Sequence, residues 1–314
     1  MNKKRLTIAK WIFEIILIIA LSFIYYLNKS VETSKVLYIP PGSITKIIAY
    51  LHYKEIDVSP LDGFLLRFIG QPQQGWISID EPKLTHADFL YKLTTAKAAM
   101  KDVTLIPGET TYFFLQDLSN EMNLSLLELK RAYDRLTPLK EGALVPETYK
   151  LPLGITEYDA MKLLLNRSSL QMKAWSNKIF GLYNEHKWFQ YVTMASVIQK
   201  EAASKKEMPL IGSVIQNRLK KGMKLQMDGT LNYGVYSHQK VTAKRIRNDE
   251  TPYNTYKYKG LPSLPVCNVS FDALKAAIFP AKTDYLYFVK TKNGDHKFTR
   301  NYSTHLRYIR RVTK

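Results

Sequence analysis

One glutamate of this sequence, Glu201, ends an apolar helical pattern and is the side chain best placed for acid–base chemistry. The residues three, four and seven positions before it, Ile198, Val197 and Met194, lie on its side of a helix and are all apolar. Loss of water around a carboxyl group favours its neutral form, and the negative end of a helix dipole acts in the same direction. We therefore predict a raised pKa for Glu201, which suits a general acid working near neutral pH. The alternative is an exposed glutamate at a helix end, flanked by lysines.

Two further carboxyl groups follow Glu201 along the chain. Glu207 lies six residues later, a rotation of about 600° in a helix, so its side chain would point well away from Glu201. We expect Glu207 to begin or cap the next helix. Asp228 stands in a short polar segment with Gln226 and Thr230, where it could turn the chain or bind a sugar.

Metal, nucleotide and serine-nucleophile chemistry lack their sequence signals. The six histidines have no paired helical spacing, and the single cysteine adds no metal cluster. Residues 108–111 lack the lysine of a phosphate-binding loop, and no Gly-x-Ser-x-Gly turn occurs. We therefore predict no metal site and no cofactor. His296 is expected to hold a backbone carbonyl in a hairpin.

The elements that would position these residues can be traced from periodicity and turn residues. Residues 188–203 and 210–219 show strong helical patterns. Shorter elements are expected as helices at 43–51, 85–93, 111–122 and 270–278, strands at 76–79 and 103–106, and a hairpin over 285–299. Together these elements predict a mixed α+β fold.

The charge of the chain limits its partners. Lys and Arg number 46 against 27 Asp and Glu, which gives a net charge of +19 that favours anionic polymers. The chain has no zinc-finger, ribonucleoprotein or basic-leucine pattern, so nucleic acid is not expected as a partner. An anionic membrane surface or a cell-wall polymer carrying carboxylates fits the charge.

The N-terminal sequence predicts a membrane anchor. Residues 11–27 form an apolar run interrupted only by Glu14 and Ser22, at the short end of what spans a bilayer. The basic residues of the tail, 1–10, should stay in the cytoplasm and direct the rest outward; they are Lys3, Lys4, Arg5 and Lys10. A cleaved signal peptide is the alternative, but residues 28–34 offer no small-residue cleavage site. The prediction is a single-pass protein of the cytoplasmic (inner) membrane with an extracytoplasmic catalytic domain.

Several ordered blocks resemble the endolytic murein transglycosylases, the YceG-like family of bacterial cell-wall enzymes. The first block runs from Glu201 to Gly234 and includes Glu207, Asn217, Arg218, Gln226, Asp228, Thr230 and Tyr233. The others lie at Glu141–Gly142, Pro146–Tyr149, Thr251–Tyr256, Gly260–Pro262, Ala276–Ala277, Pro280–Lys282 and Tyr285–Val289. The similarity covers roughly residues 36–305. Gly229 stands where the family usually has proline, and Asn268, Val269 and Ser270 replace a common Asn-Pro-Gly; we expect both departures to affect loop shape only.

The resemblance implies a domain order and a reaction. An N-terminal region over 36–150 would contain a LysM-like subdomain, and residues 151–314 would form the catalytic domain. Glu201 would act as the one catalytic carboxyl group, cleaving the bond from N-acetylmuramic acid to N-acetylglucosamine with formation of a 1,6-anhydro end. Peptidoglycan strands, the membrane and penicillin-binding synthases would be the partners, and the reaction would terminate strand elongation.

The candidate substrate contacts are polar or aromatic residues of the later blocks. Gln226 and Asn254 carry amides that pair with acetamido groups, Tyr253 could stack on a pyranose ring, and Asp228 could bind sugar. For Tyr253 and Asn254 the alternative to substrate contact is a structural role in an ordered turn after Pro252. For the whole protein, the alternatives are a noncatalytic membrane-anchored peptidoglycan-binding module that recruits synthases and, with less support, a glycoside hydrolase.

Overall fold

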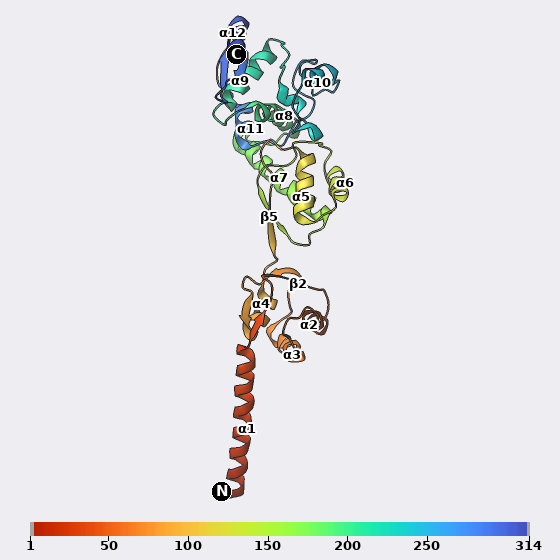
Figure 1. Ribbon diagram of the computed structural model, residues 1–314, viewed down its shortest axis with the longest axis vertical. Coiled ribbons are helices and arrows are strands. Elements are labelled where there is room, and N and C mark those ends of the chain that lie inside the picture. The colour runs from red at the N-terminus through yellow and green to blue at the C-terminus, as the bar shows by residue number, and fades with distance from the viewer. Residues whose placement is uncertain (1–2, 313–314) are drawn as a thin grey trace. The chain divides into compact units, whose positions relative to one another are not determined.

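The computed structural model describes residues 3–312, without the side chains of residues 3–5. The side chains of Lys3, Lys4 and Arg5, on which the predicted orientation depends, therefore lie outside the described part. Helices and short two-stranded sheets alternate along the chain in a mixed α+β fold, as predicted (Figure 1). The chain divides into two compact units, Met1–Lys101 with Lys150–Gly154 and Asp102–Tyr149 with Ile155–Lys314. The N-terminal region expected over 36–150 thus contributes to both units.

The first helix, α1 (Lys3–Asn28), is long and apolar enough to cross a membrane. Its segment Leu6–Asn28 has a mean hydropathy of 2.1, and none of it is buried against the rest of the protein. Glu14 is paired with Lys10 at 3.8 Å, one turn earlier on the same helix. The apolar run is therefore longer than the predicted 11–27, and its length and composition fit a single-pass anchor.

Unit 1 packs three helices against two antiparallel strand pairs. The pairs are β1 (Ser30–Glu32) with β4 (Lys83–Thr85) and β2 (Val36–Ile39) with β3 (Gly75–Ser78). The helices are α2 (Ile44–Tyr53), α3 (Pro60–Ile69) and α4 (His86–Thr95). Their inward faces form one apolar core that includes Ile39, Ile47, Leu51, Leu66, Ile77, Phe89 and Leu93.

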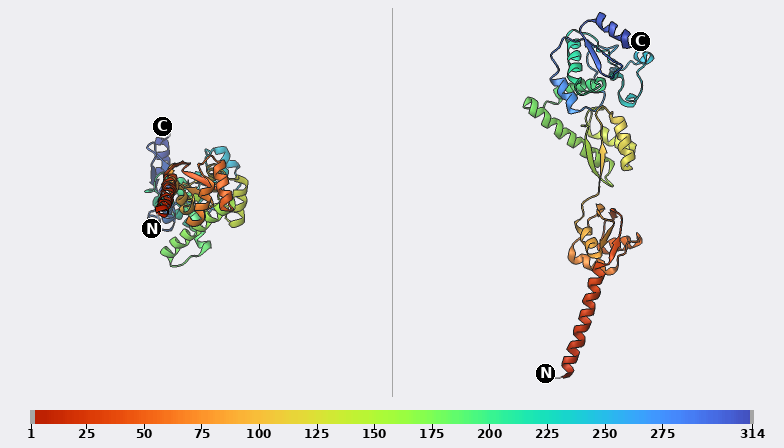
Figure 2. Two further views of the ribbon diagram at one scale, coloured as in Figure 1. Left: turned by 90° about the horizontal axis from the view of Figure 1, so that it is seen from below. Right: turned by 60° about the vertical axis from the view of Figure 1, so that its left-hand side comes forward.

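Unit 2 is mainly helical. Its helices are α5 (Thr111–Met122), α6 (Leu126–Leu136), α7 (Glu157–Phe180), α8 (Glu185–Glu201), α9 (Met208–Lys220), α10 (Ala243–Asn248), α11 (Phe271–Ile278) and α12 (Tyr302–Val312). Strands β7 (Tyr287–Lys290) and β8 (His296–Thr299) form an antiparallel hairpin against which α12 packs (Figures 1 and 2). The short strands β5 (Met100–Thr104) and β6 (Thr148–Pro152) pair with each other.

Helix α8 is the centre of unit 2 and packs on both α9 and α11 (Figure 1). Nearly every residue from Val192 to Ile198 is inaccessible to solvent, because neighbours cover the helix on several sides. The shared core includes Val192, Ala195, Val197, Ile198, Ile211, Val214, Ala273, Leu274 and Ala277. The last turn of α8 is thereby held rigidly, which fixes the direction of the side chain at its end.

Most of the predicted elements are confirmed. Helices α2, α4, α5, α8, α9 and α11 and the β7–β8 hairpin match their predicted ranges within a few residues. Local capping explains α2 and α11, which begin after Ser43 and Ser270, whose hydroxyls accept backbone N–H groups of the first turn. The strand expected at 103–106 instead covers Met100–Thr104, so it begins and ends earlier than predicted.

Candidate active site

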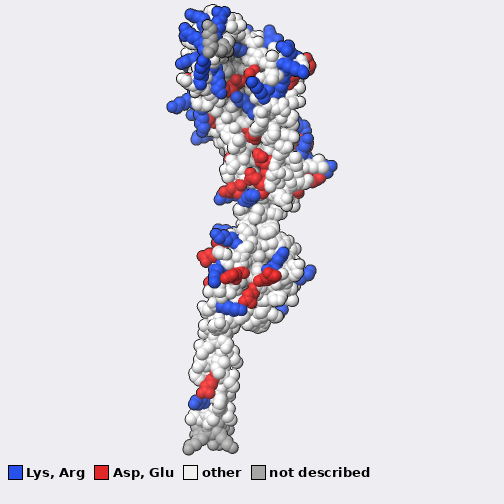
Figure 3. Space-filling model, viewed as in Figure 1, with Lys and Arg blue, Asp and Glu red and all other residues white. Residues whose placement is uncertain are grey.

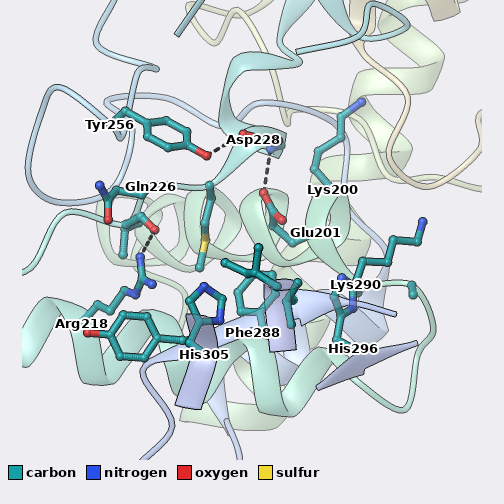
Figure 4. A pocket seen from close by; sticks show the side chains of 18 of the residues that line it. Lys200, Glu201, Arg218, Gln226, Asp228, Tyr256, Phe288, Lys290, His296 and His305 are labelled. Carbon is teal, nitrogen blue, oxygen red and sulfur yellow. Dashed lines mark hydrogen bonds between the residues drawn. The ribbon is translucent and has the colours of Figure 1, made fainter. Parts of the chain in front are cut away.

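Glu201 is the last residue of α8 and lines a cavity of about 710 Å³ in unit 2 (Figure 4). The helix stops there because Ala202 takes an extended conformation, with φ of −71° and ψ of 128°. The wall of the cavity comes from six parts of unit 2: the end of α8 with the two residues after it, Arg218 of α9, the segment 225–232, Tyr256, the β7–β8 hairpin and α12. Side chains from segments more than 100 residues apart thus surround one carboxyl group.

The 3-10 helix η1 (Asp228–Leu231) supplies the hydrogen bond to this carboxyl group. The backbone N–H of Gly229 donates to Oε1 of Glu201 at 2.7 Å. Within the described residues no protein group donates a hydrogen bond to the other oxygen, Oε2. One oxygen of Glu201 is therefore fixed by the backbone, while the other has its hydrogen-bonding capacity left for a ligand.

The position of Gly229 depends on its lack of a side chain. A Cβ atom there would lie 2.7 Å from Cβ of Lys200 and 2.9 Å from Oε1 of Glu201, both closer than real contacts allow. A proline would also lack the N–H that donates to Glu201. We expected this departure from the family pattern to affect loop shape only, but it lies in direct contact with the candidate catalytic group.

Burial raises the pKa of Glu201 to about 7. The Gly229 N–H and the charge of Arg218 act against this increase in pKa, whereas the negative charge of Asp228 adds to it. The direction and the main cause agree with the prediction from the apolar spacing of α8. A carboxyl group with this pKa is present in both its acid and its base form near neutral pH, as a group that first donates and then accepts a proton requires.

Gln226 and Asp228 lie in the same cavity as Glu201 (Figure 4). Asp228 accepts a hydrogen bond from the hydroxyl of Tyr256 at 2.6 Å. Burial, with Asp228 next in effect, raises the pKa of Tyr256, so this tyrosine remains a neutral donor. Gln226 has a left-handed backbone, with φ of 50°, and an exposed side chain. These two predicted residues are therefore brought together with Glu201.

Tyr253 and Asn254 are not among the residues that line this cavity. The ring of Tyr253 stacks on that of Tyr233, with centroids 4.1 Å apart. Asn254 has no exposed surface; its side-chain amide donates to the carbonyls of Ile246 and Asp249, and its oxygen accepts from the Tyr256 N–H. The structure thus places Asn254 where it shapes the loop that carries Tyr256.

Sequence reasoning gave no role to two basic residues of the cavity, Arg218 and His305. The guanidinium of Arg218 donates to the carbonyls of Leu225 and Leu286 and lies 5.2 Å from the centre of the Tyr287 ring. His305, on α12, stacks on the ring of the same tyrosine, with ring centroids 5.2 Å apart. Burial, together with the nearby arginine, lowers the pKa of His305. The apolar spacing of Leu306 and Ile309 was the signal for α12 in the sequence.

The prediction that His296 holds a backbone carbonyl is wrong. Its Nδ1 lies 2.9 Å from Oε2 of Glu207, and its backbone N–H donates to Oε1 of the same residue at 2.8 Å. Glu207 stands at the start of α9, as expected, but its side chain makes no capping hydrogen bond. The pair instead connects α9 to the β7–β8 hairpin, because the carboxylate can accept from two donors of one residue.

Within the part of the chain that the structure describes, no group of His, Cys, Asp and Glu is arranged to hold a metal ion.

Lysines and arginines gather over the C-terminal part of unit 2 (Figure 3). Residues 281–314 contain nine of them against two aspartates. The cavity, to whose wall this segment contributes, is itself lined by Lys200, Arg218 and Lys290 as well as by Glu201 and Asp228, and the basic segment favours a ligand that carries carboxylates or phosphates.

Comparison with known proteins agrees with the family resemblance. The profile of the YceG-like family matches residues 37–311. A curated endolytic murein transglycosylase from Bacillus subtilis (strain 168) is 35% identical over 166 residues, which is 52% of this chain and 46% of that protein. One from Streptococcus pneumoniae (strain ATCC BAA-255 / R6) is 31% identical over 181 residues, 54% of this chain and 31% of that protein. The chain therefore spans less than half the length of these curated relatives.

A solved structure shares the fold. The crystal structure of a yceG-like protein from Listeria monocytogenes aligns with a TM-score of 0.58 and 24% identity, covering 89% of this chain and 99% of that one. Because the family profile extends over most of the chain, from strand β2 to α12, this protein belongs to the YceG-like family.

Proposed function

We propose that this protein is a membrane-anchored lytic transglycosylase of murein, with Glu201 as its catalytic acid and base. The observation that carries the proposal is the state of Glu201: its pKa is about 7, one oxygen is held by Gly229, and the carboxyl group faces an open cavity. The names of the curated relatives identify murein as the substrate class.

The reaction needs no second carboxyl group and no water. The protonated carboxyl of Glu201 donates its proton to the oxygen that joins C1 of N-acetylmuramic acid to N-acetylglucosamine, and that C1–O bond breaks. The resulting carboxylate then accepts the proton of the muramic C6 hydroxyl, whose oxygen forms a new bond to C1. The carboxyl group returns to its acid form, and the product strand ends in a 1,6-anhydro sugar. Both roles suit a group whose pKa lies near the working pH.

The other residues of the cavity would bind and orient the glycan. Gln226 exposes an amide that can pair with an acetamido group. Asp228 and Tyr256 form one hydrogen-bonded unit beside the reacting carboxyl. Lys200 and Lys290 line the same cavity and could pair with the carboxylates of murein peptide stems.

Helix α1 would hold the enzyme in the cytoplasmic membrane with unit 2 outside. Such an anchor would confine cutting to newly made strands and thereby terminate their elongation near penicillin-binding synthases. A LysM-like subdomain is proposed within residues 36–150, a range that the structure divides between the two units. This arrangement predicts that a reporter fused after Lys314 is active only outside the cytoplasm; activity inside, or a mature chain beginning near residue 30, would contradict it.

Mass spectrometry of digested murein tests the reaction. The full chain should release fragments with anhydro-muramic ends, which lack the mass of the water that a hydrolase adds. Fragments with reducing ends would show a hydrolase, and no fragments from a folded protein that still binds murein would show a noncatalytic binding module. The Glu201→Gln variant serves as the blank, because its amide cannot donate a proton to the leaving oxygen.

A further inference from the structure

The outward face of α3 in unit 1 is apolar. Leu61, Phe64 and Phe68 stand on one side of this helix, and their exposed fractions are 41%, 53% and 76%. The two phenylalanine rings contact each other, with centroids 5.0 Å apart. The opposite side of the helix is fully buried and carries Asp62 and Leu66. Helix α3 thus has a buried inner face and, separately, an exposed apolar face directed away from the core.

Two features make this face suited to lipid. Arg67 flanks the apolar stripe, where its long side chain can reach phosphate groups while the rings enter the acyl region. A cavity of about 630 Å³ between α2 and α3 opens beside Phe64 and is lined mostly by apolar residues such as Ile48 and Val58. Contiguous exposed apolar surface of this kind marks an interaction site rather than ordinary solvent-facing surface.

The end of the anchor helix is tied to the first turn of α3. The hydroxyl of Tyr26, near the end of α1, donates to Asp62 at 2.6 Å and lies 2.9 Å from the hydroxyl of Ser59, the N-cap of α3. The same tyrosine ring packs on His86 at the start of α4, at 4.5 Å. The connection of α1 to the globular part of unit 1 is therefore a packed junction, not a free linker.

The length of α1 sets the depth of this junction. From Leu6 to Tyr26 the helix rises about 30 Å, which equals the thickness of the hydrocarbon core. If the span begins at Leu6, Tyr26 lies at the edge of the hydrocarbon, where tyrosines are enriched. Helix α3 lies at the end of unit 1 from which α1 leaves (Figures 1 and 2). Its first turn is then at the level of the lipid headgroups.

We propose that α3 docks on the membrane that α1 spans, with Leu61, Phe64 and Phe68 in the interfacial layer and Arg67 at the phosphates. This inference rests on the proposed anchor and extends it. The membrane would contact unit 1 at two places, α1 and α3, and would fix the tilt of this unit on the bilayer surface. A single span alone leaves that tilt free.

The test uses the full chain with one added cysteine at a time. Cys267, the native cysteine, is completely buried, so a dye coupled to an introduced cysteine reports one position. Phe64→Cys and Phe68→Cys probe the face, Ile16→Cys probes the span, and Glu81→Cys is the water-exposed control. Strand β1 leads the chain away from α1 to Glu32, which pairs with Lys83 in the β1–β4 register. Glu81 lies two residues before Lys83 and therefore beyond the end of the strand pair that is farther from α1.

The labelled proteins are placed in nanodiscs of phosphatidylcholine and phosphatidylglycerol whose acyl chains carry bromine either near the headgroup, to report on positions 64 and 68, or near the methyl end, to report on position 16 at the middle of the span. We expect the dyes at 64 and 68 to lose emission to the brominated lipid and to resist a water-soluble quencher, whereas the dye at 81 behaves in the opposite way. Quenching at 16 without quenching at 64 and 68 would overturn the docking and leave the anchor standing. No quenching at 16 would remove the anchor itself and the docking with it.

Two other occupants of the face would also overturn the proposal. Protection of positions 64 and 68 that requires added murein strands would assign the face to glycan. Cross-linking between the introduced cysteines of two chains, with no lipid quenching, would assign it to a second copy of the protein. Because the substituted side chains are exposed, the variants keep the buried core of unit 1.

Discussion

Unit 2 contains two glutamates whose pKa values are raised by burial to about 7, Glu201 at the end of α8 and Glu141. Each borders a cavity, of about 710 Å³ for Glu201 and about 750 Å³ for Glu141. Their hydrogen bonds differ. Both oxygens of Glu141 accept from the Thr111 N–H, and the Thr111 hydroxyl and the Gly142 N–H donate to Oε1 as well. Glu201 accepts one hydrogen bond, from Gly229.

The difference separates a carboxyl group whose oxygens are occupied by the protein from one that is open to a ligand, which is the proposed catalytic group. Glu141 is 6% exposed and accepts from the N–H of Thr111, the first residue of α5, which has no partner within its own helix. Its oxygens are thus occupied by the protein. Glu201 keeps an oxygen for a ligand. A raised pKa and a neighbouring cavity are shared by both residues, so neither property alone identifies the catalytic group.

The largest expected effect comes from removing the acid at each position. Glu201→Gln should lower the rate of anhydro-product formation by roughly 100-fold to 10,000-fold, as is typical for the loss of a general acid and base. Glu141→Gln should leave the rate per folded molecule within a few-fold of the natural protein. Both rates are measured by product mass spectrometry after circular dichroism has confirmed the fold. If Glu141→Gln removed activity from a folded protein and Glu201→Gln did not, the two assignments would be reversed.

The second effect is on stability, and here the two glutamates should behave alike. A carboxyl group whose folded-state pKa is raised binds more protons in the folded than in the unfolded chain between about pH 4.5 and about pH 7. The free energy of unfolding therefore falls as pH rises through this window, by on the order of 3 kcal/mol for a fully buried group such as Glu141 and by less for Glu201, whose side chain is partly exposed. In either glutamine variant the decrease between pH 5 and pH 8 should be smaller.

Urea unfolding at several pH values measures this decrease in both variants and in the natural protein. The amide of Glu141→Gln keeps only one acceptor oxygen for the donors at α5, so this variant should also be less stable than the natural protein at pH 5. If the free energy of unfolding of Glu141→Gln depended on pH as in the natural protein, the pKa of the Glu141 carboxyl group would not be raised by folding.

The sequence predicted the apolar surroundings of Glu201 in the last turn of α8, but it did not predict that the pKa of Glu141 is raised as well. Met194, Val197 and Ile198 precede Glu201 at helical spacing, so its apolar setting could be inferred locally. Glu141 has no such pattern around it. Its raised pKa depends on burial against Thr111, which lies 30 residues away in the chain. Local periodicity cannot report contacts made by folding.

The same limit explains what was missed around the cavity. The hydrogen-bond donor to Glu201 is the N–H of Gly229, 28 residues later in the chain. Its close approach is possible because glycine has no side chain. Loop residues carry no periodicity, so Tyr253 and Asn254 could not be distinguished from Tyr256 as candidates for the cavity wall. Of these three, Tyr256 alone lines the cavity.

The Gly229 contact offers a test in which two substitutions add the same Cβ atom. Gly229→Ala keeps the N–H, whereas Gly229→Pro, the residue usual in the family, also adds the rest of its ring and removes the N–H. A hydrogen bond to a charged group contributes about 1.5–3 kcal/mol, so the proline variant should be roughly tenfold or more less active than the alanine variant. It should also show a higher apparent pKa for the catalytic group, because the lost donor stabilises the carboxylate. Equal rates and equal pH profiles would mean that the N–H contributes nothing.

The smallest expected effect concerns the charge beside Glu201. A general acid must be protonated, so kcat/KM should fall as pH rises through the pKa of Glu201. The negative charge of Asp228 raises that pKa, and Asp228→Asn should therefore move this limb of the profile to lower pH. The shift should be less than about one pH unit, because Asp228 is exposed to solvent and its field is screened.

High salt should reduce the difference in pH profile between the Asp228→Asn variant and the natural protein. The asparagine oxygen can still accept from Tyr256, which keeps the loop in place. A limb that moves to higher pH, or does not move at low salt, would show that a group other than Glu201 controls the rate.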